Sequence, residues 1–339
     1  MSFITWRKRL DLKRTTMFPE YFLKPITGHS KGSKYFQSLS IIGYLRFIEG
    51  MSIPMEPAIS VWRVPDNYKT CLSLEKITLT PAPKSLDEAT RQLPGGAYTT
   101  FRTFGQYQVL NLTDHLNRLE ETARLDDKPV TIDRSTLKKA LHEAFEQFPS
   151  NEKRVRVILD LSHNLGALYI LIEKLVVPSS QDYEQGVKVI TRAMRRQNPR
   201  AKLTGFIETA ETVRQEVPEG IHEVVMVDEQ GRALEGLSSN FFAVKDGVIW
   251  TAAEGVLAGI TRQTVLDIIR AQGIPLHLEG IPVEGVADLD EAFLTSTSRA
   301  VLPIQEIDGH IIGDGAPGEV TRAIMAAFQE QIDKNVETV

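Results

Sequence analysis

Glu235 and Lys202 are the two side chains whose types and surroundings could carry chemistry in this 339-residue chain. Glu235 lies in the run Ala233-Leu-Glu-Gly-Leu-Ser-Ser-Asn-Phe-Phe242, near the end of an expected strand and beside small polar residues. The run could also be no more than two strands and a Gly-Ser turn. Lys202 precedes an expected helix, where a lysine is ordinarily a surface residue. A desolvated lysine with a lowered pKa can instead form a Schiff base with a carbonyl group.

The run Gly259-Ile-Thr-Arg-Gln263 could bind a phosphate group. We expect it to begin a helix, where free backbone N–H groups and the helix dipole favour an anion. The Thr261 hydroxyl adds a donor, and Arg118 could supply a fixed positive charge, because arginine grips phosphate oxygens through two N–H groups. A reactive amine, a phosphate site and an acid opposite a pyridine nitrogen are together what pyridoxal phosphate requires.

Composition favours a globular chain of two domains. Single cores stop growing at roughly 250–300 residues, and this chain is longer, with 42% hydrophobic residues. Cys71 is the only cysteine, which excludes an internal disulfide framework and a Cys-rich metal site. A reducing compartment is therefore the default. Because no apolar run reaches the roughly 18 residues of a membrane helix, we expect a cytoplasmic protein without a membrane partner.

The N-terminal segment differs in charge from the rest. Residues 1–50 carry nine lysines and arginines against Asp11, Glu20 and Glu49, a balance of +6 that leaves −11 for the remainder of a chain whose net charge is −5. Such a segment could bind nucleic acid or direct targeting, but its basic residues are thinly spread between prolines and glycines. We expect residues 1–55 to be a poorly ordered extension, with Met51 as an alternative start and no nucleic-acid partner.

Alternating strand and helix patterns predict a small α/β domain over residues 56–177. We expect strands at 98–104 and 109–112 and a hairpin formed by 154–161 and 167–175. Between them, one helix should begin at an N-cap, Thr113, and a second amphipathic helix should cover 137–148. Residues 178–184, which begin Pro-Ser-Ser, are the expected linker.

Residues 185–335 are expected to form a larger domain, with strands at 187–191, 223–227, 241–244, 248–250 and 291–296 and helices at 206–216, 261–272 and 320–332. Gly313-Asp-Gly-Ala-Pro-Gly318 matches a dinucleotide-binding pattern, but no β-α-β unit follows it, so we expect a turn that starts the last helix. The seven histidines lack ligand spacing, so packing or surface roles are expected and no metal site is indicated. Ser238 and Ser239 lack a nucleophile elbow, so the sequence does not favour serine hydrolysis.

Five motifs follow one another in the order and spacing of a known family: Leu112-Thr-Asp-His-Leu-Asn-Arg-Leu119, Pro199-Arg-Ala-Lys202, Leu234-Glu-Gly-Leu-Ser-Ser-Asn-Phe-Phe242, Leu257-Ala-Gly-Ile-Thr-Arg262, and Phe293-Leu-Thr-Ser-Thr-Ser298 with Ile307-Asp-Gly-His-Ile-Ile-Gly-Asp-Gly315. Together, over residues 94–330, they resemble the class IV, fold-type IV pyridoxal-phosphate aminotransferases. That family includes branched-chain and D-amino-acid aminotransferases and aminodeoxychorismate lyase.

The resemblance implies a role for each matching residue. Lys202 matches the lysine that forms the Schiff base and moves a proton, and Glu235 matches the acid at the pyridine nitrogen. The cofactor-binding residues implied are Arg118, Lys202, Glu235, Ser239, Asn240, Ile260, Thr261 and Thr297. The substrate pocket implied contains Tyr98, Phe206 and Ser298. The resemblance further implies an α/β (α+β) fold, with a small α/β domain, a larger pseudo-barrel domain and the cofactor between them, and a homodimer whose partner subunit closes the pocket.

Some positions depart from the family pattern. Gly205 stands where many members carry Asn, Phe206 stands where Tyr or Leu is common, and the strand at Tyr98 lacks the usual acidic residue after the aromatic. Residues 1–93 also lack the usual opening strand pattern. The substrate's side chain and stereochemistry therefore stay open.

The function implied is an aminotransferase that moves an amino group between an amino acid, of branched-chain or D-amino-acid type, and a 2-keto acid. Two alternatives remain: aminodeoxychorismate lyase, which eliminates pyruvate with the same cofactor, and a non-catalytic protein that binds pyridoxal phosphate.

Overall fold

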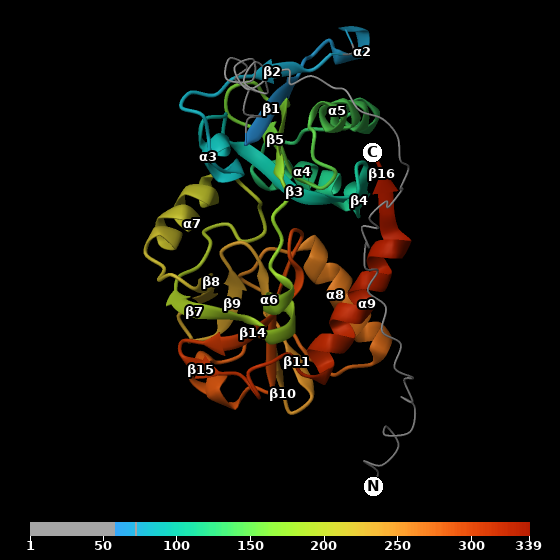
Figure 1. The fold of residues 1–339 in the computed structure, drawn as a ribbon. Coiled ribbons are helices and arrows are strands. Elements are labelled where there is room, and N and C mark those ends of the chain that lie inside the picture. The colour runs from blue at the N-terminus through green and yellow to red at the C-terminus, as the bar shows by residue number, and fades with distance from the viewer. Residues whose placement is uncertain (1–57, 72) are drawn as a thin grey trace, which may run out of the picture. The chain divides into compact units, whose positions relative to one another are not determined.

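The computed structural model describes residues 58–71 and 73–339. The extension expected over residues 1–55 and the alternative start at Met51 lie outside the described residues. Within the described part, no helix has both the length and the apolar character needed to cross a membrane. Two sheets organise this part of the chain, and each has helices packed against it (Figure 1).

The first sheet has seven strands in the order β16-β4-β3-β5-β6-β1-β2, all antiparallel. Its strands are β1 (Ile59–Val64), β2 (Glu75–Ile77), β3 (Gly96–Phe104), β4 (Gln108–Leu110), β5 (Lys153–Asp160), β6 (Leu168–Lys174) and β16 (Val336–Thr338). Because side chains alternate along a strand, Phe101 and Val155 face a core formed with two helices, α4 (Leu112–Leu125) and α5 (Arg134–Gln147). Tyr98 and Ile158 lie in a separate cluster with α3 (Leu86–Arg91). The short helix α2 (Tyr68–Cys71) follows β1.

The second sheet closes on itself. Six strands run in the order β10-β13-β14-β7-β8-β9, and β9 pairs back with β10, so they form a pseudo-barrel. β11 and β12 extend the sheet from β10, and β15 pairs with β14. The strands are β7 (Val187–Ala193), β8 (Ile221–Val227), β9 (Ala233–Gly236), β10 (Asn240–Lys245), β11 (Val248–Trp250), β12 (Leu276–His277), β13 (Glu291–Ser296), β14 (Ala300–Ile307) and β15 (His310–Ile311).

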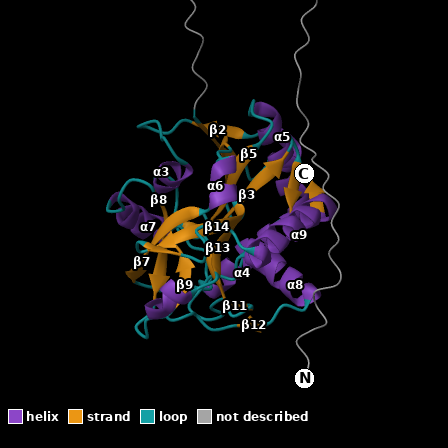
Figure 2. Ribbon diagram, turned by 60° about the horizontal axis from the view of Figure 1, so that its bottom comes forward, coloured by secondary structure: helices purple, strands orange, loops and turns teal. Residues whose placement is uncertain are grey.

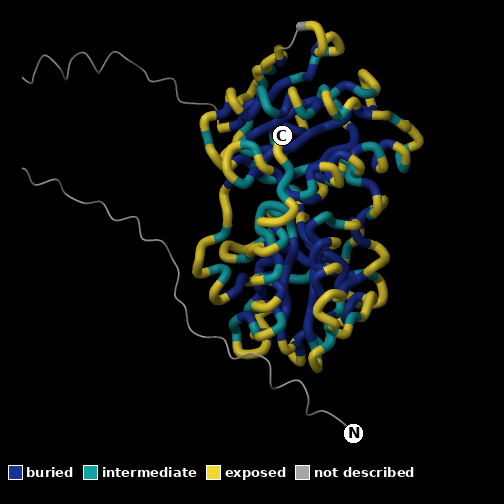
Figure 3. Tube along the Cα trace, turned by 90° about the vertical axis from the view of Figure 1, so that its right-hand side faces the viewer, coloured by how far each residue is buried: buried dark blue, intermediate teal, exposed yellow. Residues whose placement is uncertain are grey.

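Helices α8 (Ile260–Gln272) and α9 (Glu319–Asn335) pack together beside the barrel strands (Figure 2). They cover an apolar face where the rings of Phe242 and Phe293 stack 4.8 Å apart. Buried residues run through the strands of both sheets, while exposed residues concentrate in the connections (Figure 3). The remaining helices are α6 (Ser180–Gln185), α7 (Gly205–Gln215) and the 3-10 helix η1 (Val283–Asp288). This mixed α/β architecture confirms the expected fold class.

Most predicted elements form within a few residues of their expected bounds, and β11 and β13 have the predicted bounds. The turn expected at Gly313-Asp-Gly-Ala-Pro-Gly318 is also present: Gly313 and Gly315 have φ of 53° and 75°, and α9 begins at Glu319. The expected linker contains α6, which is stabilised by a capping box between Ser179 and Asp182.

Two expectations were wrong. Thr113 is not an N-cap: α4 begins at Leu112 after Asn111, which has the left-handed φ of 52°, and the Thr113 hydroxyl donates to Glu337 in β16 at 2.7 Å. The described residues before 93 do contain strands, β1 and β2. β1 was missed because α3 and α5 both contact it and nearly all of its residues are buried, which removes the apolar-polar alternation of a half-exposed strand.

The start of α9 supports a test of stability. Its N-cap, Gly318, has no side chain, and Glu291 of β13 instead accepts the Val320 and Thr321 N–H groups at 3.0 and 2.6 Å. Glu291→Ala should lower the free energy of unfolding by about 2 kcal/mol, because the buried N–H groups lose a charged acceptor. Urea unfolding measures this loss. Glu330→Ala, which removes an exposed pair with Lys334, should cost less than about 0.5 kcal/mol; equal losses would contradict the capping role.

Candidate active site

A cavity of about 680 Å³ lies between the seven-stranded sheet and the barrel. All eleven residues predicted from the sequence line it: Tyr98, Arg118, Lys202, Phe206, Glu235, Ser239, Asn240, Ile260, Thr261, Thr297 and Ser298. They come from β3, α4, the segment before α7, α7 itself, β9, the β9–β10 connection, the start of β10, the start of α8 and the β13–β14 turn. The fold therefore gathers residues that are up to 200 positions apart in the chain, from 98 to 298.

The backbone around Lys202 is attached to the edge of the seven-stranded sheet. Tyr98 N–H donates to the Lys202 carbonyl at 2.9 Å, and Gly96 N–H donates to the Thr204 hydroxyl at 3.0 Å. Lys202 N–H donates to the Thr122 hydroxyl of α4 at 3.3 Å. These bonds fix the lysine between β3 and α4, so its side chain enters the cavity from a rigid base.

The Lys202 side chain is half-buried, and its amine lies over an aromatic ring. Its Nζ lies 4.8 Å from the centroid of the Tyr98 ring. Burial, together with the nearby Arg196 and Arg118 guanidinium groups, lowers the pKa of Lys202 to about 8 against the opposing effect of Tyr98. Roughly a tenth of the amine is consequently neutral, and nucleophilic, at pH 7, far more than for an ordinary lysine.

Glu235 is buried in β9, and three donors bind its carboxylate. Arg196 Nε donates to Oε1 at 2.7 Å, while Asn240 Nδ2 and Leu257 N–H donate to Oε2 at 2.9 and 3.0 Å. Burial raises the pKa of Glu235 above its ordinary value, although Arg196 and the Leu257 N–H act in the other direction. The result is a desolvated acid whose orientation is fixed.

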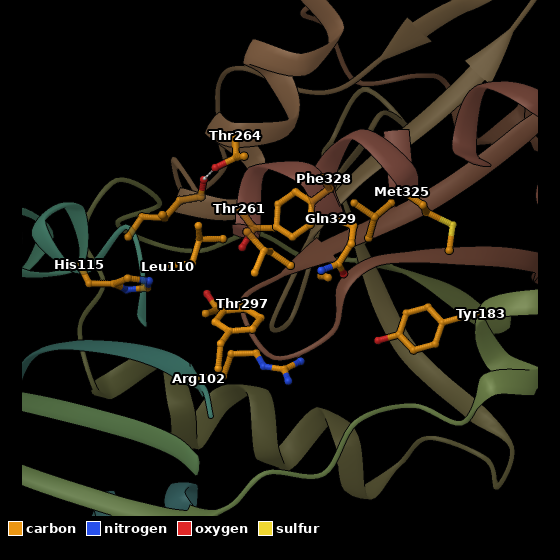
Figure 4. Close-up of a pocket in the computed structure, with 15 residues that line it drawn as sticks. Arg102, Leu110, His115, Tyr183, Thr261, Thr264, Thr297, Met325, Phe328 and Gln329 are labelled. Carbon is orange, nitrogen blue, oxygen red and sulfur yellow. Dashed lines mark hydrogen bonds between the residues drawn. The ribbon is translucent and has the colours of Figure 1, made fainter. Parts of the chain in front are cut away.

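The start of α8 forms the third part of the site. Its N-cap is Gly259, and a Cβ there would come within 2.0 Å of Asn240 Oδ1, so this close approach requires glycine. The N–H groups of the first helical turn have no helical acceptor, and Arg118 donates to the Ala258 carbonyl beside them. Thr297 lies across the space from Thr261 (Figure 4). Free N–H groups, hydroxyls and an arginine together suit a phosphate.

Sequence reasoning missed His115. We expected a packing or surface residue, but the ring, although buried, lines this cavity and a second one of about 310 Å³. Both cavities share His115, Ile260, Thr261 and Thr297 (Figure 4). His115 Nδ1 lies 2.7 Å from the Thr99 hydroxyl, and burial, with Arg118 and Lys202, holds the pKa of His115 well below its usual range. The imidazole is therefore neutral at ordinary pH.

Sequence reasoning also missed the ion pairs in the cavity wall, among them the following two. Arg196 pairs with Glu235, and its guanidinium lies 3.7 Å from the centroid of the Phe206 ring. Arg299 pairs with Glu223 at 3.0 Å. The Glu223 carboxylate also accepts the Ser238 and Ser239 hydroxyls, so the predicted cofactor-binding residue Ser239 has its hydroxyl engaged in the wall. The one available signal was Glu223 itself, an acidic residue in a strand whose following residues, Val224-Val-Met-Val227, are all apolar.

A pseudo-barrel with Lys202 and the start of α8 beside one cavity agrees with the family that the sequence motifs resemble. Residues 96–307, more than half of the chain, match the model of the family described as amino-transferase class IV. The chain belongs to this family. It is an enzyme of the class IV transaminase family, as the sequence motifs predicted.

Relatives in this family have more than one named activity. A branched-chain-amino-acid aminotransferase of Pseudomonas aeruginosa is 28% identical over 246 residues, which cover 68% of this chain and 80% of that protein. A D-alanine aminotransferase of Bacillus licheniformis is 26% identical over 265 residues, which cover 71% of this chain and 89% of that protein. Because the identities to these two relatives are similar, sequence identity does not distinguish between their substrates.

Solved structures share the fold. A Thermotoga maritima protein described as a branched-chain amino acid aminotransferase superposes with a TM-score of 0.67 at 26% identity, over 81% of this chain and 96% of that one. A branched-chain amino acid aminotransferase of T.th., solved with pyridoxamine 5'-phosphate, gives a TM-score of 0.67 at 19% identity, over 82% of this chain and 98% of that one. The expected fold-type IV architecture is thus confirmed.

The surroundings of Lys202 predict an unusual pH dependence of its reactivity. Reductive methylation by formaldehyde requires the neutral amine, and a pKa of about 8 makes half of the Lys202 amine neutral near pH 8. In the cofactor-free protein, methylation of Lys202 should therefore rise with a midpoint near pH 8. Peptide mass spectrometry after labelling between about pH 6 and pH 11 resolves this residue from the other lysines. A midpoint near the ordinary lysine value of 10.5 would show that the amine is not desolvated.

Proposed function

We propose that this protein is a pyridoxal-phosphate-dependent aminotransferase that transfers an amino group between an amino acid and a 2-keto acid. The observation that carries the proposal is the arrangement of Lys202, Glu235 and the start of α8 around one cavity. Membership of the class IV family supports the same reaction. The structural relative solved with pyridoxamine 5'-phosphate supports the cofactor.

The donor set fits the proposed cofactor. Pyridoxal phosphate is an aldehyde with a pyridine nitrogen and a phosphate, so it needs an amine, an acid and an anion site. Lys202 offers a half-buried amine whose pKa is lowered, and Glu235 offers a buried carboxylate. Arg118, Thr261 and Thr297 with the N–H groups of Ile260 and Thr261 would hold the phosphate, and Asn240 would hold Glu235 in place.

The chain's own residues would perform positioning and proton transfer. When bound, pyridoxal phosphate supplies an aldehyde that condenses with amines and a ring that accepts the electron pair released at the substrate's α-carbon. Lys202, once free, would act as the base that takes the proton from the α-carbon, because its lowered pKa lies close to the operating pH. Glu235 would balance positive charge at the ring nitrogen. The cavity walls would exclude bulk water from these groups.

The substrate pocket would lie beside Tyr98, Phe206 and Ser298. Amino acids of branched-chain type or D-amino acids are the proposed donors, since relatives with both activities match the chain.

We further propose that residues 56–177 and 185–335 act as two domains joined by residues 178–184, and that the enzyme works as a homodimer in the cytoplasm. Cross-linking at native concentration would test the homodimer, and interdomain distances measured with spin labels would test the two-domain assignment.

A single-turnover assay tests the reaction. Wild-type protein loaded with pyridoxal phosphate should lose its aldehyde-lysine absorbance on mixing with an amino-acid donor and should yield pyridoxamine phosphate and a keto acid. Lys202→Ala should abolish that absorbance, because it removes the amine of the site. Lys245→Ala, which changes a surface pair with Asp288, is the matched control and should behave like wild type. Release of pyruvate from aminodeoxychorismate without pyridoxamine phosphate would identify a lyase, and no turnover with any donor would leave a binding protein.

Glu235→Gln tests the assigned acid. Glutamine keeps the side-chain size but removes the charge, so the protein should fold and still bind cofactor while the rate of the first half-reaction falls by about 100-fold or more. Stopped-flow absorbance gives the rate, and equilibrium dialysis gives the cofactor affinity. A wild-type rate in this variant would return the segment around Glu235 to a purely structural role.

A further inference from the structure

Arg196 is an arginine buried in the cavity wall. It is 6% exposed, and its Nε donates to Glu235 Oε1 at 2.7 Å. One Nη2 hydrogen bond reaches the Leu237 carbonyl at 3.2 Å, and the guanidinium packs on the Phe206 ring. Its Nη1 is buried and has no hydrogen-bond partner among the described residues. The guanidinium is thus desolvated without a complete set of acceptors.

The pair between Arg196 and Glu235 is a poor source of stability. Removing two charges from water costs several kcal/mol per ion, and their attraction repays this only when all remaining donors are satisfied. Here one donor is not satisfied. The neighbouring Arg195 has the ordinary arrangement for a surface arginine, with a side chain that is 68% exposed and a loose pair to Glu229 at 3.5 Å. The fold therefore orients one of two adjacent arginines inward, where its charge acts on Glu235.

Arg196 is the cation in direct contact with Glu235. Within the described residues, Arg196 is the one lysine or arginine within ion-pair distance of the Glu235 oxygens. Lys202, Arg118 and Arg262 act on Glu235 at longer range. If the proposed function holds, Lys202 is committed to the aldehyde of the cofactor and Arg118 to its phosphate. Arg196 then remains as the cation that acts on Glu235 directly.

We propose that Arg196 is a positioning residue that keeps Glu235 ionised. The proton that Glu235 shares with the ring nitrogen of the cofactor thereby stays on the nitrogen. The inference rests on the proposed function and deepens it. One proton is distributed between the carboxylate and the pyridine nitrogen, with the proton on nitrogen in the charged arrangement and on oxygen in the neutral one. Burial favours the neutral arrangement, because it contains no desolvated charge. The adjacent guanidinium favours the charged one, because it stabilises the carboxylate.

The consequence for catalysis follows from the position of the proton. A protonated ring nitrogen withdraws electrons strongly, and a neutral one does so weakly. Arg196 would therefore control the electron-accepting strength of the cofactor without touching its reacting atoms. Glu235 alone, in a buried site that favours its neutral form, would not keep the proton on nitrogen.

The test measures the ring nitrogen directly, without turnover. Each protein is reconstituted with pyridoxal phosphate labelled with ¹⁵N in the ring, and the ¹⁵N chemical shift reports whether that nitrogen is protonated. Wild type should show the protonated shift. Arg196→Gln should move the resonance most of the way toward that of a neutral pyridine, and Arg196→Lys, which keeps a charge, should restore much of the protonated shift. Arg195→Gln is the matched control and should leave the resonance unchanged.

The variants separate failure of the inference from failure of the proposed function. If wild type binds no pyridoxal phosphate, or if Glu235→Gln leaves the resonance in place, the proposed function or the assignment of Glu235 is wrong. If Glu235→Gln moves the resonance but Arg196→Gln does not, the inference about Arg196 is wrong. Arg196→Met keeps apolar packing on Phe206 and replaces Arg196→Gln if thermal unfolding shows that the glutamine variant does not fold. A protonated shift in Arg196→Met would overturn the inference equally.

Discussion

The site depends on one physical constraint: the Lys202 amine must be held partly out of water. Backbone hydrogen bonds to Tyr98 and Thr122 hold the lysine between β3 and α4. An amine in such a place loses hydration, and the charged form loses more than the neutral form. The pKa of about 8 follows from this burial first and from the surrounding arginines second. The same backbone bonds tie the segment before α7 to the seven-stranded sheet, so the chemistry and the joining of the two sheets share one set of contacts.

Once the cavity excludes water, an acid in its wall needs a nearby cation. Glu235 faces Arg196, Glu223 faces Arg299, and Asp87 faces Arg156. Two glycines make room for these polar groups. At Gly236 a Cβ would lie 2.3 Å from Ser239 Oγ, and at Gly259 it would lie 2.0 Å from Asn240 Oδ1. The glycines of the two motifs are thus required by close packing of buried polar side chains, while their backbone angles are ordinary for other residues.

Sequence reasoning reached the members of the cavity wall that belong to recognisable motifs. The strand, turn and helix signals around Glu235 and Thr261 could be predicted because they depend on local residue types. Arg196 could not be separated from Arg195, because the choice of which arginine turns inward is made by Glu235, 39 positions away. Glu223 has the same limitation: an acid in a strand normally predicts an exposed face, and its contacts with Arg299 and with the Ser238 and Ser239 hydroxyls make burial tolerable. β1 was missed because covering helices on both faces erase the alternation.

Of the positions that depart from the family pattern, Thr99 and Phe206 line the cavity, whereas Gly205 is exposed and does not. Thr99 stands where an acid is usual, and its hydroxyl bonds to His115 within the buried core of that region. Neither partner brings a charge, so position 99 adds no anion to the acids already in the cavity wall, Asp87, Glu173, Glu223 and Glu235. In the proposed function, the selectivity of the pocket would depend on Thr99 and on the aromatic rings of Tyr98 and Phe206, with the cations packed over them.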